Sequence, residues 1–301
     1  MRKLILWGGI FSTLLSCNNS TSEFEIYGHR GWRGMYPENS MVGFAQAAKA
    51  GITHFELDVV ISADGLVVVS NKPWLSSVIC SDPNGNALYE STERAYNLYQ
   101  MRYSEIARCE CGLRKHPDFP DQKKVSARKP LLSTVLDSLE KLKPPGVEFY
   151  YNIDIKSMSG GDNVFHPVPQ TFVETVLGVI MLNGVEKNTM IQSFDNRVLI
   201  YMHEYFPEVK LSLAVDEGES VEEKWVDLGF TPDVISPHYS LLYLDLVKEI
   251  HQAGVRVIPW PVNDLHEAER LRQLGVDGFI TDYPGQYYLP SSSDQSAEVQ
   301  P

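Results

Sequence analysis

Two acidic residues, Glu56 and Asp58, are separated by a single residue in a segment rich in β-branched and aromatic side chains. Alternate side chains of a strand share one face, so both carboxylates are expected to point the same way. Asp154 supplies a third carboxylate within another apolar run. Carboxylates on one face repel each other unless a cation lies between them. Oxygen donors without cysteine or paired histidines suit Mg²⁺ or Ca²⁺, and also Mn²⁺, better than zinc.

Three further side chains suit the chemistry of phosphate groups. His29 and Arg30 end the first predicted strand, and Lys156 follows Asp154 by two residues. Arginine holds phosphate oxygens through a forked pair of hydrogen bonds, and lysine acts as a point charge. An oxygen-ligated cation beside Arg, Lys and His is typical of phosphoryl chemistry. The alternative is that the acids only form salt bridges with Arg30 and Lys156. The presence of three acids together makes this alternative less favoured than a metal site.

Short strand-like runs alternate with longer helical patterns from residue 25 onward, which is typical of βα units around a parallel sheet. Eight strands are expected at residues 26–28, 54–61, 149–155, 190–194, 211–215, 234–236, 255–260 and 279–281, with a hairpin return at 67–69. Amphipathic segments lie at residues 40–50, 196–206, 242–253 and 265–274. The sequence predicts an α/β fold of the TIM (β/α)₈ barrel type. The acids and His29 then lie at the C-terminal mouth, where barrel enzymes place their chemistry.

A long insertion follows the third strand segment, at about residues 76–129, and contains three cysteines. Plain loops of this length are uncommon, which indicates a functional or capping segment. Cys80 and Cys111 are the favoured disulfide, closing a loop worth roughly 3 to 4 kcal/mol. Pairing of Cys80 with Cys109, or three free thiols, are the alternatives. Cys109-Glu110-Cys111 has no matching second pair, so it does not predict a metal site.

The first 17 residues combine a basic start, an apolar run and a small residue before Cys17. This pattern predicts a lipoprotein signal peptide over residues 1–17, with acylation of Cys17; an ordinary secretory signal is the alternative. We expect an exported protein, lipid-anchored in the bacterial cell envelope. Residues 18–24 are expected to form a linker, 25–290 the barrel and 291–301 a disordered tail.

The chain carries a formal net charge of −13. Loss of Arg2 and Lys3 with the signal peptide removes two positive charges and gives −15. Such a surface disfavours nucleic acid, which requires clustered lysine and arginine. Small substrates remain compatible, because the local charge of a pocket can oppose the global sign.

Several ordered motifs resemble those of the glycerophosphodiester phosphodiesterase family over nearly the whole length after Cys17. The matching segments are His29-Arg30-Gly31, Pro37-Glu38-Asn39-Ser40, Glu56-Leu57-Asp58-Val59, Asn152-Ile153-Asp154-Ile155-Lys156, Ser193-Phe194-Asp195, Trp260-Pro261-Val262-Asn263 and residues 275–284. The resemblance implies a TIM barrel with a divalent cation on Glu56, Asp58 and Asp154. It implies hydrolysis of glycerophosphodiesters to glycerol 3-phosphate and an alcohol, with attack by a neighbouring glycerol hydroxyl through a cyclic phosphate.

The resemblance also implies roles for single residues. His29 is expected to act as acid or base, Arg30 and Lys156 to bind phosphate, and Trp260 to line the substrate pocket. Without the resemblance, Trp260 would be interpreted simply as a core residue.

Three positions depart from the family's pattern. Asn71 replaces the second histidine, Lys72 replaces the following acid, and Asp154 replaces a glutamate. Asparagine can donate a hydrogen bond to a leaving oxygen but cannot give up a proton. A positioned general acid or base contributes ~10²- to 10⁴-fold, which is the loss expected from Asn71. Lys72 is expected to add positive charge near the carboxylates, and the shorter Asp154 to shift the metal.

Another histidine could act as a substitute acid. His238 follows the strand at 234–236 and is the candidate, whereas His54 is expected to pack in the core, and His203, His251 and His266 to be solvated on outer helices. The leading hypothesis is a metal-dependent hydrolase of small glycerophosphodiesters or lipid head groups. The rival is a pseudoenzyme that binds a phosphodiester or phospholipid head group without turnover. A third hypothesis is a lyase-like relative that releases a cyclic product.

Overall fold

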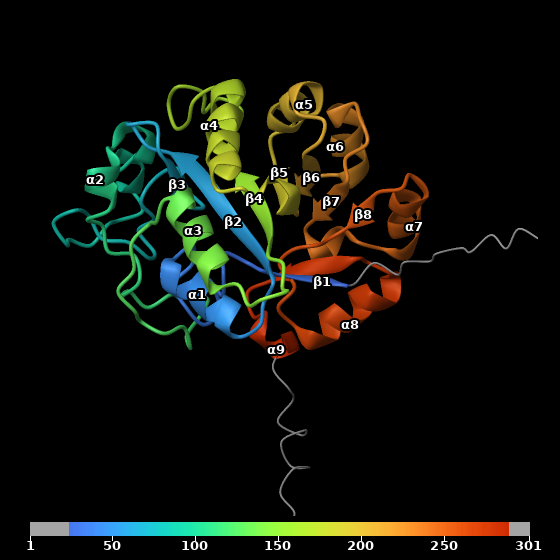
Figure 1. Ribbon diagram of the computed structural model, residues 1–301, viewed down its shortest axis with the longest axis horizontal. Coiled ribbons are helices and arrows are strands. Elements are labelled where there is room, and N and C mark those ends of the chain that lie inside the picture. Colours follow the sequence, from blue (N-terminus) through green and yellow to red (C-terminus); the bar gives the residue numbers. More distant parts are fainter. Residues whose placement is uncertain (1–23, 289–301) are drawn as a thin grey trace, which may run out of the picture.

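A closed ring of parallel strands forms the centre of the computed structural model, which describes residues 24–288 (Figure 1). The eight parallel strands are β1 (Glu25–Gly28), β2 (His54–Ile61), β4 (Tyr150–Ile155), β5 (Thr189–Ser193), β6 (Lys210–Val215), β7 (Val234–Pro237), β8 (Arg256–Val257) and β9 (Gly278–Thr281). They pair in the order β8-β7-β6-β5-β4-β2-β1-β9. Backbone hydrogen bonds from Asp277 to Val257 and from Ile280 to Pro259 join β9 to β8. The predicted TIM barrel is confirmed.

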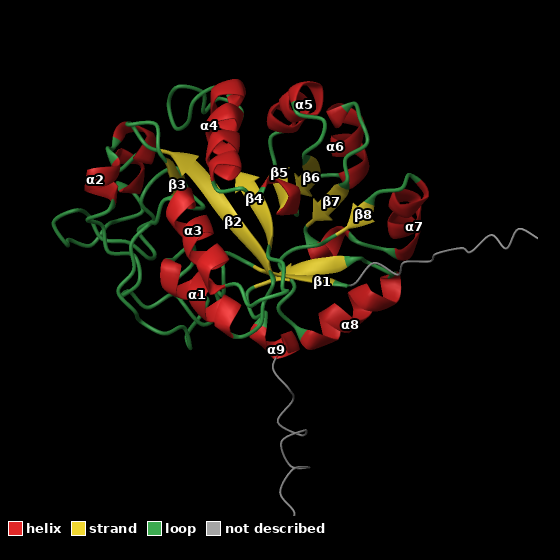
Figure 2. Cartoon of the chain, viewed as in Figure 1, coloured by secondary structure: helices red, strands yellow, loops and turns green. Residues whose placement is uncertain are grey.

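Helices surround the strands on the outside of the ring (Figure 2). They are α1 (Met41–Lys49), α3 (Leu132–Leu142), α4 (Pro169–Leu182), α5 (Asn196–Tyr205), α6 (Val221–Leu228), α7 (Leu244–Gln252), α8 (Leu265–Leu274) and the short α9 (Gly285–Tyr288). Ser40 caps α1, because its hydroxyl accepts a hydrogen bond from the Gly43 N–H at 3.1 Å. Gly51 follows this helix with a φ of +89°, as expected for the residue that ends a helix.

The two faces of β2 explain how the core and the site are separated. Phe55, Leu57 and Val59 are fully buried between the sheet and the helices, and each contributes roughly 1.5 to 3 kcal/mol of hydrophobic stabilisation. Glu56 and Asp58 alternate with them and point to the inside of the ring. The apolar alternation of one strand therefore fixes the direction of both carboxylates.

The strand predicted over residues 255–260 is shorter in the structure, where β8 contains only Arg256 and Val257. Pro259 and Pro261 have no N–H to donate and interrupt the regular pairing. The N–H groups of Ile258 and Trp260 still donate to Ile235 and Pro237, so the segment stays beside β7.

The insertion after β3 (Val67–Val69) has its own small core. β3 pairs antiparallel with β2, which confirms the predicted hairpin. The insertion then forms η1 (Glu93–Ala95), η2 (Leu98–Gln100) and α2 (Tyr103–Ile106). Its buried apolar residues, Leu75, Ile79, Leu98 and Ile106 among them, pack against Val60 and Val68. The segment is therefore anchored on the hairpin and is not a free loop.

The favoured disulfide between Cys80 and Cys111 is confirmed, and Cys109 is a buried free thiol. Replacing both bridged cysteines with alanine is expected to lower the free energy of unfolding by about 3 to 4 kcal/mol, because the open loop gains chain entropy. Urea denaturation of the variant and its parent measures this difference. The Cys109→Ala variant keeps the closed loop and serves as the control. Equal stability of the double variant and this control would show that the bridge contributes nothing.

Within residues 24–288, no helix has both the length and the apolar character needed to cross a membrane. The predicted signal peptide, Cys17, most of the predicted linker and the predicted tail at 291–301 lie outside the described residues.

Candidate active site

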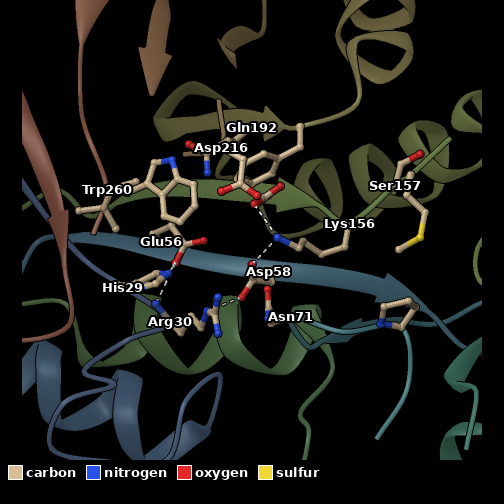
Figure 3. A pocket seen from close by; sticks show the side chains of 15 residues that line it. His29, Arg30, Glu56, Asp58, Asn71, Lys156, Ser157, Gln192, Asp216 and Trp260 are labelled. Carbon is tan, nitrogen blue, oxygen red and sulfur yellow. Dashed lines mark hydrogen bonds and ion pairs between the residues drawn. The ribbon is translucent and has the colours of Figure 1, made fainter. Parts of the chain in front are cut away.

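A cavity of about 330 Å³ at the C-terminal mouth of the barrel brings together all the residues predicted for the site (Figure 3). Its lining includes His29, Arg30, Glu56, Asp58, Asn71, Asp154, Lys156 and Trp260. Gln192 and Phe194 from β5 and the segment after it complete one side. Residues that lie in or just after five of the parallel strands therefore meet Asn71, which follows the hairpin, in one small space.

The three predicted metal ligands form a compact cluster. Ligand oxygens of Glu56, Asp58 and Asp154 all lie within 4.8 Å of one another, and all three residues are buried. The register of the sheet places Asp154 of β4 directly beside Asp58 of β2. Burial and the neighbouring charge of Asp58 raise the pKa of Glu56 well above its ordinary value. Burial also raises the pKa of Asp154. The cluster therefore resists full ionisation without an added cation.

Two basic residues neutralise part of this cluster (Figure 3). Lys156 Nζ lies 3.2 Å from Asp58 Oδ1 and 3.0 Å from Asp154 Oδ2, and Arg30 Nε lies 3.0 Å from Asp58 Oδ2. Burial opposes the charge on Asp58, but Arg30 and Lys156 hold the pKa of this carboxyl well below its ordinary value. The salt bridges considered as an alternative are thus present, and they are part of the same site.

A divalent cation fits the remaining donors. Asp154 Oδ1 is buried and has no hydrogen-bond partner among the residues that the structure describes. A buried oxygen without a partner costs free energy that a bound cation would recover. Three carboxylates facing two basic side chains leave negative charge in a space lined by oxygen donors, which suits Mg²⁺, Ca²⁺ or Mn²⁺.

The backbone at Arg30 is bent so that one residue contacts three acids. Its φ is +50° and that of Gly31 is +88°, both in the left-handed region. A non-glycine residue pays roughly 1–3 kcal/mol for an unfavourable backbone conformation, and such strain gathers at functional sites. In return, the Arg30 N–H donates to Glu56 Oε2 at 2.9 Å, and its Nη1 donates to Glu38 Oε2 at 3.1 Å.

His29 is held in a defined orientation by a residue from the other end of the chain. Its Nδ1 lies 2.7 Å from Asp282 Oδ1, and Asn263 Nδ2 donates to Asp282 Oδ2 at 2.7 Å. Burial opposes ionisation of Asp282, but His29 and Arg33 hold the pKa of this carboxyl well below its ordinary value. An ionised Asp282 keeps the proton of neutral His29 on Nδ1. The lone pair on Nε2, which lies 3.9 Å from Glu56 Oε2, is then available to accept a proton.

Asp282→Asn is expected to lower kcat by about 10- to 100-fold, the usual cost of removing a partner that orients a site residue. The amide can donate to Nδ1 and favour the wrong tautomer of His29. The kcat/KM profile against pH should change shape as well. Tyr283→Phe, which changes the adjacent residue, is the control. A uniform loss with the parent's pH profile would indicate damage to the fold instead.

Asn71 and Lys72, which depart from the family's pattern, lie in different surroundings. Asn71 lines the cavity as predicted. Lys72 does not line this cavity but a neighbouring one, which it shares with Arg30 and Asn71. Its Nζ pairs with Glu93 Oε1 of the insertion at 3.1 Å and lies 5.9 Å from the Trp74 ring centroid. The buried Glu93 carboxylate thus holds the Lys72 ammonium group against the insertion.

The remaining histidines lie outside the lining of the cavity. His238 Nδ1 pairs with Ser240 Oγ at 2.7 Å, and its ring packs edge-on against Trp260 with centroids 5.6 Å apart. It therefore does not reach the site as a substitute acid in this structure. His54 stacks on Tyr150 at the far end of β2.

The expectation that the outer histidines are solvated is confirmed, because His203, His251 and His266 are all exposed. His203 stacks on Phe230 with centroids 4.0 Å apart, and His251 Nε2 lies 2.9 Å from Asp277 Oδ2.

Sequence reasoning gave no role to several side chains that hold the site in place. Glu38 binds Arg30, Asn39 Nδ2 donates to Asp58 Oδ2 at 2.7 Å, and Asp282 orients His29. All three belong to the motif segments quoted above, which was the available signal. Burial opposes the charge of Glu38, but Arg30 and Arg33 lower its pKa to about 2.

Comparison with known proteins agrees with this geometry. The family model for the glycerophosphoryl diester phosphodiesterase family matches residues 29–286. A glycerophosphodiester phosphodiesterase from Caldanaerobacter subterraneus is 26% identical over 260 residues, which cover 86% of this chain and 94% of that protein. One from Bacillus altitudinis is 24% identical, with 86% and 95% covered.

Solved structures show the same fold. A putative glycerophosphoryl diester phosphodiesterase from Silicibacter pomeroyi superposes with a TM-score of 0.77 at 28% identity, covering 88% of this chain and 92% of that chain. An Oleispira antarctica phosphodiesterase, solved in complex with the product sn-glycerol-3-phosphate, gives a TM-score of 0.68 at 21% identity, with 87% and 94% covered.

Proposed function

The chain belongs to the glycerophosphoryl diester phosphodiesterase family of phosphoric diester hydrolases, and we propose that it hydrolyses glycerophosphodiesters to glycerol 3-phosphate and an alcohol in a metal-dependent reaction. The observation that carries the proposal is the buried Glu56, Asp58 and Asp154 cluster beside an oriented His29. Relatives that carry this activity in their names, and a neighbour with bound product, support the same reaction.

The phosphodiester binds between the two basic residues that now contact the carboxylates. Arg30 and Lys156 exchange part of their ion pairs for phosphate oxygens, which keeps their charges paired. A divalent ion on Glu56, Asp58 and Asp154 supplies Lewis-acid stabilisation of the phosphate charge. Phe194 and Trp260, whose ring centroids lie 5.4 Å apart, form the apolar wall beside the substrate.

His29 is the general base for the attacking hydroxyl group. Its Nε2 accepts the proton of the attacking hydroxyl, which belongs to the glycerol of the substrate or to water, and Asp282 stabilises the charged ring that results. Attack by the glycerol hydroxyl gives a cyclic phosphate that is hydrolysed in a second step. Asn71 faces the departing alcohol and donates a hydrogen bond to its oxygen, but the proton of that alcohol comes from solvent.

Release of glycerol 3-phosphate from a set of glycerophosphodiesters, by protein that begins after Cys17, tests the proposal. Mg²⁺, Ca²⁺ or Mn²⁺ should support release, and a chelator should stop it. Accumulation of the cyclic phosphate in place of glycerol 3-phosphate would assign the lyase-like reaction instead.

A binding protein without turnover is the second candidate, favoured by the absence of a proton donor at Asn71. The double variant Asn71→His, Lys72→Asp restores the expected pair and separates the two candidates. A silent parent with an active variant would establish a disabled phosphodiesterase, kept, if for anything, for binding. Active parent protein, accelerated further by the variant, supports the hydrolase with a reduced rate.

We further propose that an acylated Cys17 anchors the protein in the cell envelope, on the strength of residues 1–17 alone. Incorporation of labelled palmitate by the full chain, lost in Cys17→Ala, is the measurement. Lack of labelling would instead indicate that residues 1–17 are an ordinary secretory signal.

A further inference from the structure

A second cavity, of about 140 Å³, lies next to the active-site cavity and shares two lining residues with it. Arg30 and Asn71 line both spaces, so they form the boundary between them. The second cavity is otherwise built from the segment after β1 and from the insertion. Its volume is several times the roughly 30 Å³ that one water molecule occupies in the liquid, so it has room for a small substituent.

The most informative residue of this cavity is Lys129. The residue is only 5% exposed, and its Nζ forms no hydrogen bond or ion pair with any other described residue. Burial lowers the pKa of Lys129 to about 8, and the more distant charges of Glu38 and Asp58 compensate only in part. A buried ammonium group without a partner is unfavourable, and native proteins normally pair it. An anion in the cavity would supply the missing partner.

A second donor points to the same kind of ligand. His116 Nδ1 accepts a hydrogen bond from the Asp118 N–H at 3.2 Å, which places the proton of the neutral ring on Nε2. This Nε2–H has no partner within the part of the chain that the structure describes, and the residue is 4% exposed. The cavity therefore offers two unused donors.

The balance of charge around the cavity is positive. Arg30, Arg33, Lys72 and Lys129 line it, against the carboxylates of Glu38 and Asp118. The Asp118 carboxylate is 76% exposed and so is screened by solvent. Arg33 Nε donates to Glu38 Oε2 at 2.7 Å, and Lys72 is held by Glu93. Of the four basic groups, Lys129 alone has its full hydrogen-bonding capacity free.

The position of Asn71 connects this cavity with the reaction. In the proposed function, on which this inference rests, Asn71 faces the oxygen of the departing alcohol. The remainder of that alcohol then extends past Asn71, away from the metal ligands and into the second cavity. We propose that this cavity is an anion-binding subsite. It binds a carboxylate or phosphate group on the alcohol part of the diester, and Lys129 is the counter-ion. The preferred substrates are therefore glycerophosphodiesters of acidic alcohols.

A pair of substrates that differ in one charge tests this subsite. The first is glycerol 3-phosphate esterified with 3-hydroxypropionate, and the second is the same diester of 3-hydroxypropionamide. The parent should show a kcat/KM about 10- to 100-fold higher for the carboxylate, as expected for a charged hydrogen bond in a buried site. Lys129→Met should bring this ratio close to one. Lys124→Met, an exposed lysine of the same segment, should keep the parent's ratio.

Several results would overturn the subsite. Equal kcat/KM for both diesters in the parent would do so without any variant, and so would an unchanged ratio in Lys129→Met. If the parent cleaves neither diester, the hydrolase proposal fails, and calorimetric dissociation constants for the same pair decide on the subsite alone. A lower dissociation constant for the carboxylate that depends on Lys129 supports the subsite in that case, and equal constants reject it.

Discussion

Replacing His29 with alanine is expected to lower kcat for glycerophosphodiester hydrolysis by about 10²- to 10⁴-fold, the usual contribution of a positioned general base. His29 is buried beside the carboxylate cluster, with Nδ1 bound to Asp282 and Nε2 directed toward Glu56. Of the histidines that the structure describes, it alone lines the active-site cavity. Steady-state kinetics at saturating metal give the comparison.

His238→Ala is the matched control for this prediction, because His238 packs behind Trp260 outside the cavity. Its kcat should stay close to that of the parent. A large loss in His238→Ala with a small loss in His29→Ala would contradict the assignment and identify His238 as the working acid or base.

The pH profile gives an independent check on His29. Burial lowers its pKa below the ordinary value of 6.5, so the ring is neutral and able to accept a proton at neutral pH. Activity should therefore fall only as the pH drops below about 6.5 and the ring becomes protonated. The parent should show this acidic limb, and His29→Ala should lose it. A limb above neutral pH would indicate a different base.

Replacing Glu56 with glutamine is expected to weaken metal binding and to lower metal-dependent activity by at least about 10²-fold. This loss of activity is larger than the loss expected when a residue that does not bind the metal is replaced. The same change should stabilise the metal-free protein, because burial and the neighbouring charges of Asp58 and Asp154 oppose ionisation of Glu56. A single substitution thus has opposite effects on stability and activity.

Thermal unfolding with and without metal measures both effects. Saturation at one hundred times the dissociation constant stabilises a protein by about 2.7 kcal/mol, so the parent's Tm should rise with Mg²⁺ or Ca²⁺. The rise should be much smaller in Glu56→Gln. Glu208→Gln, an exposed glutamate outside the barrel mouth, should respond like the parent. An equal rise in parent and Glu56→Gln would exclude Glu56 as a ligand.

The sequence predicted the parts of the site that depend on local periodicity. One residue between Glu56 and Asp58 in an apolar strand placed both carboxylates on the inner face, and the hairpin turn near Gly65 followed from local turn chemistry. The motifs also selected His29, Arg30, Asp154 and Lys156, which meet in one cavity. These features follow from strand alternation and from the rule that barrel sites lie at the C-terminal ends of strands.

Features that depend on distant contacts could not be predicted in this way. Asp282 orients His29 across 253 residues of chain, and only closure of the barrel brings them together. Lys72 is held against the insertion because Glu93 binds it. The unpaired state of Lys129 depends on how the insertion folds against Arg30 and Glu38. Pattern and spacing contain no information about such pairings.

In the proposed function, Asn71 limits the rate of the reaction, and the metal ligands and His29 are required for it. We propose that the barrel mouth hydrolyses glycerophosphodiesters with a cation on three carboxylates and one histidine as base. The family, the fold and the geometry of the cluster support that claim.

The most direct measurement follows one glycerophosphodiester by phosphorus NMR in the presence of the parent protein, first with a chelator, then with added Mg²⁺ or Ca²⁺. The diester, a cyclic phosphate and glycerol 3-phosphate give separate signals. For a metal-dependent hydrolase, we expect a constant diester signal with the chelator and its conversion to glycerol 3-phosphate once metal is added. A diester signal that broadens on binding but persists with every metal would contradict it and leave a protein that binds its ligand without cleaving it.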